Sequence, residues 1–313
     1  MLDETMTQPE LRLGTRRSPL AMVQAEEARQ RLCEAHGWPQ SAVELVPVVA
    51  SGDKIQDRPL AEIGGKALWT KELDVWLAEG RIDASVHSLK DVETVRPESL
   101  VLAAILPRAD KRDRLIGAPS IADLPQGAVV GTSAPRRAAQ LLNHRPDCSV
   151  VMFRGNVASR LGKLEAGEVD ATFLAAAGLA RLGEDDVGHP LNAEDWLPAP
   201  SQGAIALECR TDDERTRALL APLDHMPSRA EVSAERALLL ALNGTCHSPI
   251  ATLCSYADSK LHLRAAILSE DGADRVDGEA RFAAEDDAAP ARLAAQLLER
   301  ASPAICAVFD PAP

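Results

Sequence analysis

The stretch Ser85-Val86-His87-Ser88-Leu89-Lys90-Asp91 decides how the rest of this chain is interpreted. The apolar run from Ile82 to Val86 predicts a strand, and the polar cluster after it predicts a sheet edge of the kind that binds ligands in open α/β folds. Lys90 and Asp91 place an ammonium beside a carboxylate, which is typical of an acid–base site. The alternative is a charged loop in which Ser88 or Asp91 caps a helix.

The composition of the chain argues against several classes of function. Its 313 residues predict two or three domains, and a formal net charge of -13 argues against a general affinity for nucleic acids. No run of about 18 apolar residues predicts a membrane span, and the acidic N-terminus does not resemble a secretory signal. The six cysteines form neither a CxxC pair nor a metal-ligand spacing with the histidines. We therefore expect a cytoplasmic protein without a bound metal.

Alternating strand and helix patterns divide the chain into three predicted domains. A βαβα pattern up to residue 106 predicts a mostly parallel sheet, and the polar segment 107–115 predicts a crossing to a second α/β domain. The Pro-rich segment 197–203 predicts the return crossing, after which the strand 204–208 rejoins the first sheet. We expect domain 1 to span 1–106 with 204–222, domain 2 to span 107–203, and a small α+β domain 3 to span 223–313.

Arginines recur where predicted strands turn into helices. Arg16 and Arg17 follow the strand 11–13 and precede Ser18 and Pro19, a pair suited to the N-cap and the first turn of a helix. The second predicted domain repeats this pattern with five more arginines: Arg136, Arg137, Arg154, Arg160 and Arg181. Guanidinium groups and helix N-termini both bind anions. If these turns converge on one cleft, the sequence predicts a small ligand with several anionic groups.

Two further loops contain residue types that bind ligands or react. Gly64-Gly65-Lys66 has some likeness to a phosphate loop, but the Walker spacing is absent and no Ser or Thr follows the lysine. A flexible lid or hinge therefore fits better than a nucleotide site. Cys246 lies beside His247 in a Gly/Ser/Pro loop, where a thiol is expected to be accessible. A Cys/His nucleophile is one interpretation of this pair, and an ordinary loop cysteine is the other.

Taken together, these motifs resemble those of the porphobilinogen deaminase (hydroxymethylbilane synthase) family. The matching stretches cover nearly the whole chain in the family's order: TRRSPLA at 15–21, GGKALWTKEL at 64–73, VHSLKD at 86–91, VGTSAPRR at 130–137, RGNVASRL at 154–161, AAAGLARL at 175–182, PSQGAIALECR at 200–210 and NGTCHSP at 243–249. Each motif alone is weak, but their order and spacing together are specific.

The resemblance implies a fold and an activity. The expected fold has two periplasmic-binding-protein-like α/β domains with mostly parallel sheets plus a small α+β C-terminal domain. The expected activity is that of a transferase in tetrapyrrole (heme) biosynthesis, which joins four porphobilinogen molecules head to tail into hydroxymethylbilane and releases ammonia. The family uses a covalent dipyrromethane cofactor, here expected on Cys246, and a catalytic carboxylate, here Asp91. A monomer is expected.

The resemblance also assigns residues that hold cofactor and substrate, chiefly through acetate and propionate groups. The expected cofactor-binding residues besides Cys246 are Ser88, Lys90, Thr132, Ser133, Arg136, Arg137, Arg154, Gly155, Asn156 and Arg160. The expected substrate-binding residues are Arg16, Ser18, Trp69, Arg154, Arg160, Arg181 and Gln202. His87 is expected to be a buried, orienting histidine rather than a catalytic base.

Some positions depart from the usual pattern of the family: Glu62, Trp69, Glu93, Ala134, Pro135 and Thr245. Glu93 replaces a proline and Ala134 removes a hydroxyl contact. Thr245 replaces a glycine, and a β-branched residue is strained there if the position requires a positive φ. Because Asp91, Cys246 and the main arginines are present, we expect activity. The alternative is a non-catalytic, divergent protein that captures a small anion in the same two-lobed cleft.

Overall fold

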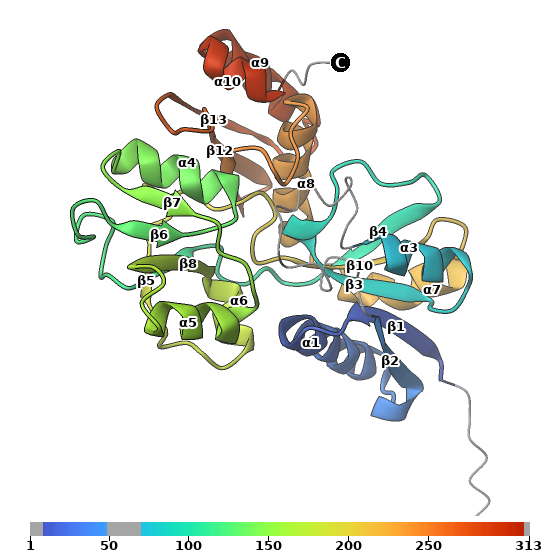
Figure 1. The fold of residues 1–313 in the computed structure, drawn as a ribbon. Coiled ribbons are helices and arrows are strands. Elements are labelled where there is room, and N and C mark those ends of the chain that lie inside the picture. The colour runs from blue at the N-terminus through green and yellow to red at the C-terminus, as the bar shows by residue number, and fades with distance from the viewer. Residues whose placement is uncertain (1–8, 49–69, 310–313) are drawn as a thin grey trace, which may run out of the picture.

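The structure, a computed structural model, describes residues 9–48 and 70–309. Its described strands form three separate sheets, around which Figure 1 shows three bodies. We call them lobe 1, lobe 2 and the C-terminal domain, in the order in which the chain enters them. The exact domain boundaries that the sequence predicts, at 106/107, 203/204 and 222/223, stay a prediction.

Lobe 1 contains a five-stranded sheet in which one strand opposes the direction of the others. The strands are β1 (Leu11–Arg16), β2 (Val43–Val48), β3 (Ala84–Ser88), β4 (Leu100–Ile105) and β10 (Ile205–Arg210). Their order is β2-β1-β3-β10-β4, with β10 antiparallel to both of its neighbours. The helical elements are α1 (Pro19–His36), η1 (Gln40–Ala42), α3 (Lys71–Ala78), η3 (Leu89–Asp91), α7 (Glu214–Leu220) and η4 (Ala221–Leu223).

The first helix forms as the sequence predicts. Ser18 is its N-cap and accepts a hydrogen bond from the Ala21 amide at 3.4 Å, while Pro19 occupies the first turn. Gly37 ends the helix with a φ of 66°, a conformation that favours glycine. Because Ala25, Ala28 and Leu32 fall on one face, α1 packs closely onto the sheet and holds the β1–α1 turn in place.

Lobe 2 repeats this arrangement with different segments. Its strands are β5 (Asp113–Ile116), β6 (Val129–Gly131), β7 (Ser149–Val151), β8 (Ala171–Ala175) and β9 (His189–Pro190), in the order β7-β6-β8-β5-β9. Its helices are α4 (Pro135–His144), α5 (Val157–Glu165) and α6 (Ala176–Arg181). In each lobe, the antiparallel strand lies next to an edge strand: this strand is β10 in lobe 1 and β5 in lobe 2. Each of these two strands follows a crossing from the other lobe. This matched pair of lobes confirms the predicted two-lobed α/β class.

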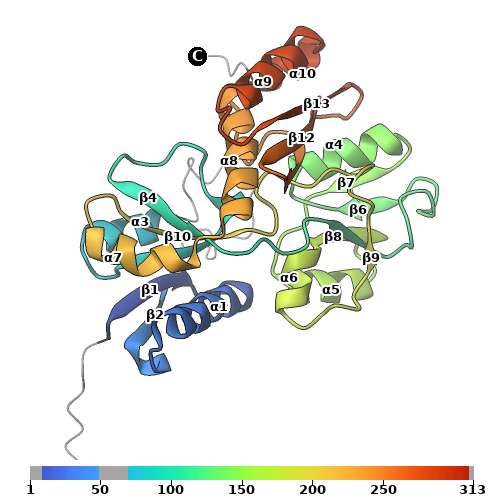
Figure 2. The same cartoon turned by 180° about the vertical axis from the view of Figure 1, so that it is seen from behind.

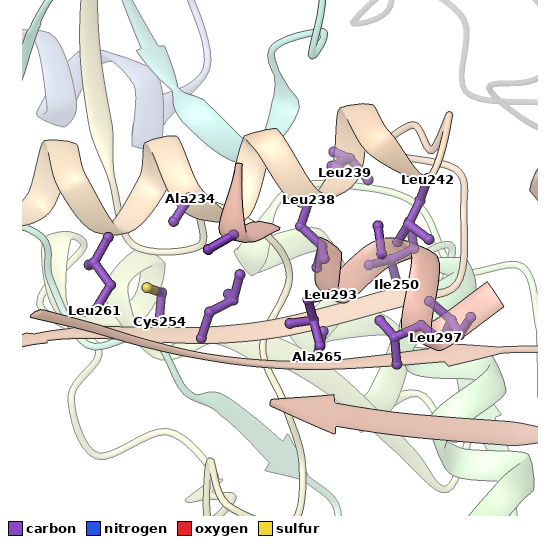
Figure 3. Packing of buried hydrophobic residues seen from close by; sticks show 14 of the residues in the cluster. Ala234, Leu238, Leu239, Leu242, Ile250, Cys254, Leu261, Ala265, Leu293 and Leu297 are labelled. Carbon is purple, nitrogen blue, oxygen red and sulfur yellow. The ribbon is translucent and has the colours of Figure 1, made fainter. Parts of the chain in front are cut away.

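The C-terminal domain is the predicted α+β unit. Its strands β11 (Ile250–Ala257), β12 (Lys260–Leu268) and β13 (Arg275–Ala283) form an antiparallel sheet. Its helices are α8 (Met226–Ala241), α9 (Ala289–Glu299) and α10 (Pro303–Phe309). Figure 3 shows Leu238 of α8 and Leu242, the residue that follows the helix, packed towards the sheet, with Leu293 and Leu297 of α9 in the same apolar cluster. This core anchors the loop between α8 and β11, which carries Cys246.

Two crossings join lobe 1 to lobe 2, and Figure 2 shows both from behind. The outgoing crossing follows β4 and the return crossing precedes β10. They contact each other where the Ala109 amide donates to the Gly203 carbonyl at 3.2 Å. Gly203 has a φ of +87°, and a Cβ there would lie 2.7 Å from the Ala109 oxygen. A glycine is therefore required where the two crossings meet.

Some element boundaries differ from the sequence prediction. The strand expected at Ile82–Val86 runs from Ala84 to Ser88, so the polar residues His87 and Ser88 belong to it. The segment 107–115, expected to be only a crossing, already contains the start of β5, because its buried residues pair with β8. The strand β13 was not predicted, since its partly exposed sequence RVDGEARFA has little apolar character.

Candidate active site

Asp91 lies at the carboxyl end of β3, in the short 3-10 turn η3. Leu89, the first residue of this turn, is buried, and its amide donates to the Ala204 carbonyl at 3.0 Å. Both features hold the turn against the sheet. Ser88 precedes the turn, but its hydroxyl does not cap it. Instead the Ser88 Oγ donates to Oε1 of Gln24 on α1 at 3.1 Å. The Ser88 side chain therefore does not cap η3, and Asp91 is the last residue of that turn rather than its N-cap. Asp91 lines a small cavity together with Arg16, Gln24, His87 and Ser88.

His87 is buried, as expected, and belongs to a polar network beneath this cavity. Its Nε2 lies 2.8 Å from the Ser85 Oγ and 3.2 Å from Oε2 of Glu208 on β10. Burial alone would raise the pKa of Glu208, but hydrogen bonds to His87 and Arg96 outweigh it and lower this pKa to about 2. The imidazole is thus held by partners within the sheet. This geometry suits the orienting role predicted for His87.

Glu93, one of the positions that depart from the family pattern, makes side-chain hydrogen bonds that a proline could not make. Arg96 Nη1 donates to its Oε2 at 2.7 Å, and the Thr70 Oγ1 donates to the same oxygen at 3.0 Å. From α8, the Arg236 guanidinium donates to the Val92 and Thr94 carbonyls, both at 3.2 Å. The chain after Asp91 is therefore fixed by side chains rather than by a proline ring. Sequence reasoning missed Arg96 and Arg236, because no local motif marks them.

Asp113 is the buried acceptor that organises the arginine turn of lobe 2. Its carboxylate accepts from Arg136 and Arg137 at 2.7 Å each, from the Trp196 indole at 2.9 Å and from the Gln202 amide at 2.9 Å. Burial opposes ionisation, but the two guanidinium groups hold the pKa of Asp113 far below its usual range. Sequence reasoning missed Asp113, since an isolated aspartate in a polar crossing gives no signal.

Cationic groups from the two lobes converge on Asp91. Burial lowers the pKa of Lys90 to about 8; Asp91 opposes this effect, whereas the charge of Arg137 adds to it. Burial likewise lowers the pKa of Arg160 to about 10, with Arg137 and Arg154 adding to the effect and Asp91 opposing it. Lys90 and Asp91 of lobe 1 therefore share one electrostatic environment with the arginines of lobe 2. Convergence of all the arginine turns on one cleft stays a prediction, since Arg136 and Arg137 pair with Asp113 and Arg181 pairs with Glu27.

The C-terminal domain brings Cys246 to the same place. The residue is exposed and its thiol is free. Desolvation of the thiolate raises the pKa of Cys246 to about 11, and the nearby carboxylates of Asp91 and Glu93 raise it further. Thr245 is not strained, because the positive φ in this loop falls on Asn243, at 53°. The charge of Asp91 thus acts on ionisable groups in both of the other bodies, Arg160 and Cys246.

Several other predicted residues have local structural partners. Ser133 Oγ donates to the Phe153 carbonyl at 2.8 Å, the Thr132 Oγ1 accepts from the Ala134 amide at 3.2 Å, and the Asn156 Oδ1 caps α5. Gly155 has a φ of +129°, which suits the turn before α5. Glu62, Gly64-Gly65-Lys66 and Trp69 lie outside the described residues.

Comparison with known proteins identifies the family. The model "Porphobilinogen deaminase, dipyromethane cofactor binding domain" matches residues 11–218, and "Porphobilinogen deaminase, C-terminal domain" matches residues 229–299. The chain belongs to the porphobilinogen deaminase family. It is 55% identical over 305 residues to the porphobilinogen deaminase of Sphingopyxis alaskensis, with 96% of each chain covered. It is 47% identical over 297 residues to that of Paracoccus denitrificans, covering 94% of this chain and 95% of the relative.

Solved structures show a more distant likeness. An ancestral cationic amino acid solute binding protein is 16% identical with a TM-score of 0.43, covering 71% of this chain and 90% of that one. A TRAP periplasmic solute binding protein from Desulfovibrio salexigens is 12% identical with a TM-score of 0.41, covering 70% and 73%. Such scores add nothing to the topology described above. No helix among residues 9–48 and 70–309 is long and apolar enough to cross a membrane.

The residues of this chain fit the cofactor for which the family model is named. A dipyrromethane carries four carboxylates on two pyrrole rings, so it needs a point of attachment and several cations. Cys246 offers an exposed thiol, and Lys90, Arg137 and Arg160 offer cations close to Asp91. Within the described part of the chain, the buried Nε atoms of Arg136 and Arg137 have no hydrogen-bond partner. At the level of the family, the predicted activity and cofactor are confirmed, and the non-catalytic alternative is not favoured.

Proposed function

We propose that this chain joins four porphobilinogen molecules head to tail into hydroxymethylbilane, with Asp91 as the catalytic carboxylate and Cys246 as the point of cofactor attachment. The observation that supports this assignment is the place of Asp91 in a small cavity at the end of β3, from which its charge acts on Arg160 of lobe 2 and Cys246 of the C-terminal domain. Gathering cations here has a cost, since the like charges of Arg137, Lys90 and Arg160 repel each other. A polyanionic ligand in the cleft removes that cost.

The cations of the cleft bind and orient the acidic side chains of the ligands. The charge of Asp91 acts on Lys90 of lobe 1 and on Arg160 of lobe 2, and Arg16 lines the cavity beside Asp91. Arginine binds a carboxylate through two parallel hydrogen bonds, which fixes orientation as well as position. Held in this way, each incoming porphobilinogen presents its aminomethyl group to Asp91.

Asp91 then stabilises the charge that develops when ammonia leaves. Departure of the amine turns the porphobilinogen ring into an electron-poor methylene-pyrrolenine with a positive nitrogen, and a fixed carboxylate lowers the energy of that state. When bound, the dipyrromethane would supply the pyrrole carbon to which the first unit is joined; each later unit would join the end of the growing chain, and water would then release the tetrapyrrole with its hydroxyl group. Formation of that carbon–carbon bond releases a proton, and Asp91 is placed to hold it.

The other expected contacts remain proposals of the same kind: Ser18, Trp69, Arg154 and Gln202 for the substrate, and Ser88, Thr132, Ser133, Arg136, Arg154, Gly155 and Asn156 for the cofactor. Arg181, also expected to contact the substrate, donates to Glu27 and to the Gly203 carbonyl instead. We also propose that the protein is a cytoplasmic monomer. The six free cysteines suit a reducing compartment. Light scattering during size-exclusion chromatography tests the monomer.

Intact mass spectrometry and an assay of porphobilinogen consumption test the proposal together. Protein made with porphobilinogen available should carry an adduct of dipyrromethane size, which Cys246→Ser abolishes and the control Cys306→Ser retains. Asp91→Asn should reduce turnover by about a hundredfold or more, because it removes a general acid–base group. The exposed Asp186→Asn is the matched control and should keep full activity. An adduct that persists in Cys246→Ser, or normal turnover by Asp91→Asn, overturns the assignment.

A further inference from the structure

The guanidinium of Arg181 connects three parts of the molecule. Its Nε donates to Oε2 of Glu27 at 3.1 Å, and its Nη2 donates to the Gly203 carbonyl at 3.3 Å. Arg181 ends α6 in lobe 2, Glu27 lies on α1 in lobe 1, and Gly203 belongs to the return crossing. One side chain therefore binds both lobes and the segment that joins them.

The Gly203 carbonyl is the point at which the two crossings meet. It accepts the Ala109 amide of the outgoing crossing at 3.2 Å as well as the Arg181 guanidinium. Lobe movement in a two-lobed protein requires the backbone to change at its crossings. Arg181 is consequently attached to the segment where such movement originates.

Glu27 is held so that it can receive Arg181. Its Oε1 accepts from the Arg31 Nη2 at 3.2 Å, one turn along α1, which leaves Oε2 for lobe 2. Only 10% of the Arg181 side chain and 27% of the Glu27 side chain are exposed, so solvent and salt screen this pair less than a surface pair. The helices α1 and α6 also contact each other, since a Cβ on Gly178 would lie 3.5 Å from Cδ2 of Leu20.

We infer that Arg181 is a positioning residue that forms, with Glu27, a latch between the lobes at their hinge. The latch sets the separation of the lobes and so aligns Lys90 and Asp91 of lobe 1 with Arg160 of lobe 2. Its effect on turnover rests on the proposed function, although the latch itself does not. The Nε and Nη2 of this guanidinium already donate to Glu27 and to the Gly203 carbonyl, so Arg181 is held by the protein itself.

Steady-state kinetics of the purified full-length protein separates the two roles of Arg181. For a latch, Glu27→Gln and Arg181→Gln each lower kcat/KM for porphobilinogen by about two- to fivefold, the range of a partly exposed ion pair. The double variant is no worse than Arg181→Gln alone, because that substitution already removes the pair with Glu27. Arg181→Lys, which retains the charge, restores part of the loss. The control Glu26→Gln removes the neighbouring glutamate, which pairs with Arg29 on the same helix, and should change nothing.

Unchanged or improved kinetics in Glu27→Gln, together with a large loss in Arg181→Gln, overturns the latch in favour of a substrate contact. Hydrogen exchange in the ligand-free protein gives a readout that needs no activity. The Ala109 amide should exchange faster in both Glu27→Gln and Arg181→Gln, but not in Glu26→Gln, because the crossings are less constrained. Equal exchange in all variants overturns the latch. Absence of turnover in the unmodified protein contradicts the proposed function alone, since the exchange experiment still tests the latch.

Discussion

The carboxylate of Asp113 lies 2.7 Å from the guanidinium of Arg137 in the interior of lobe 2. Both side chains are buried, and Arg136 pairs with the second carboxylate oxygen at the same distance. Asp113 begins β5, the strand that follows the crossing from lobe 1, whereas the arginines begin α4. The cationic turn of lobe 2 is therefore oriented by the first residue of the strand that follows that crossing.

Replacement of Asp113 by asparagine should destabilise the protein strongly. The variant leaves two buried guanidinium groups without a counter-charge, and breaking a buried pair in this way costs about 3–5 kcal/mol. The free energy of unfolding, measured with urea, gives the comparison. Asp186→Asn in the same lobe removes an exposed carboxylate and serves as the control. A loss below about 1 kcal/mol in Asp113→Asn would show that the lobe does not depend on this acceptor.

Glu208 should make the stability of the protein depend on pH in the acid range. Its pKa is about 2 in the folded protein against about 4.3 for an unfolded glutamate. The unfolded chain therefore binds the proton more tightly. The contribution of Glu208 to stability is complete above pH 4.3 and is lost as the pH falls towards 2, by up to about 3 kcal/mol.

Urea unfolding at pH 7 and at pH 3 tests this dependence. Glu208→Gln should be less stable at pH 7 and should lose less stability on acidification, because it has no carboxyl group to protonate. Glu98→Gln, which removes an exposed glutamate of lobe 1, should follow the unmodified protein. Identical acid profiles for Glu208→Gln and the unmodified protein are the contrary result.

Loss of the positive charge of Lys90 should weaken substrate binding at alkaline pH. Burial lowers the pKa of its ammonium to about 8, so its charge is lost as the pH rises through that value. We expect the KM for porphobilinogen to rise between pH 7 and pH 9. Lys90→Arg should remove this dependence, because a guanidinium keeps its charge throughout this range. A KM that rises equally in Lys90→Arg would assign the effect to another group, including the amine of the substrate.

The thiol of Cys246 should react slowly in protein that lacks the cofactor. Its pKa of about 11 keeps the thiolate fraction low near pH 8, and the thiolate is the reactive form. Alkylation by iodoacetamide, followed by intact mass, should be about tenfold or more slower than that of a small free thiol. Asp91→Asn should react faster than the unmodified protein, because it removes one of the charges that raise this pKa. A rate equal to that of the free thiol would contradict the environment described for Cys246.

Local features of the structure were predictable wherever a few neighbouring residues decide them. The cap by Ser18, the first turn at Pro19 and the position of Asp91 at a strand end follow from side-chain chemistry that acts within one turn. The strand β10 was placed in the first sheet because its apolar run follows a Pro-rich crossing. By contrast, β13 carries alternating polar residues that pattern alone did not distinguish from a loop.

The sequence by itself determined the family, the fold class and the identity of the candidate chemical groups, because motif order, hydrophobic pattern and turn residues are properties of short stretches. Tertiary structure alone decided the partners of those groups. Arg137 pairs with Asp113 across 24 residues and Arg181 with Glu27 across 154, and no local pattern encodes either pairing. A guanidinium in a sequence is only a charge, and whether it is held by the protein or faces a ligand depends on which carboxylate the fold brings to it.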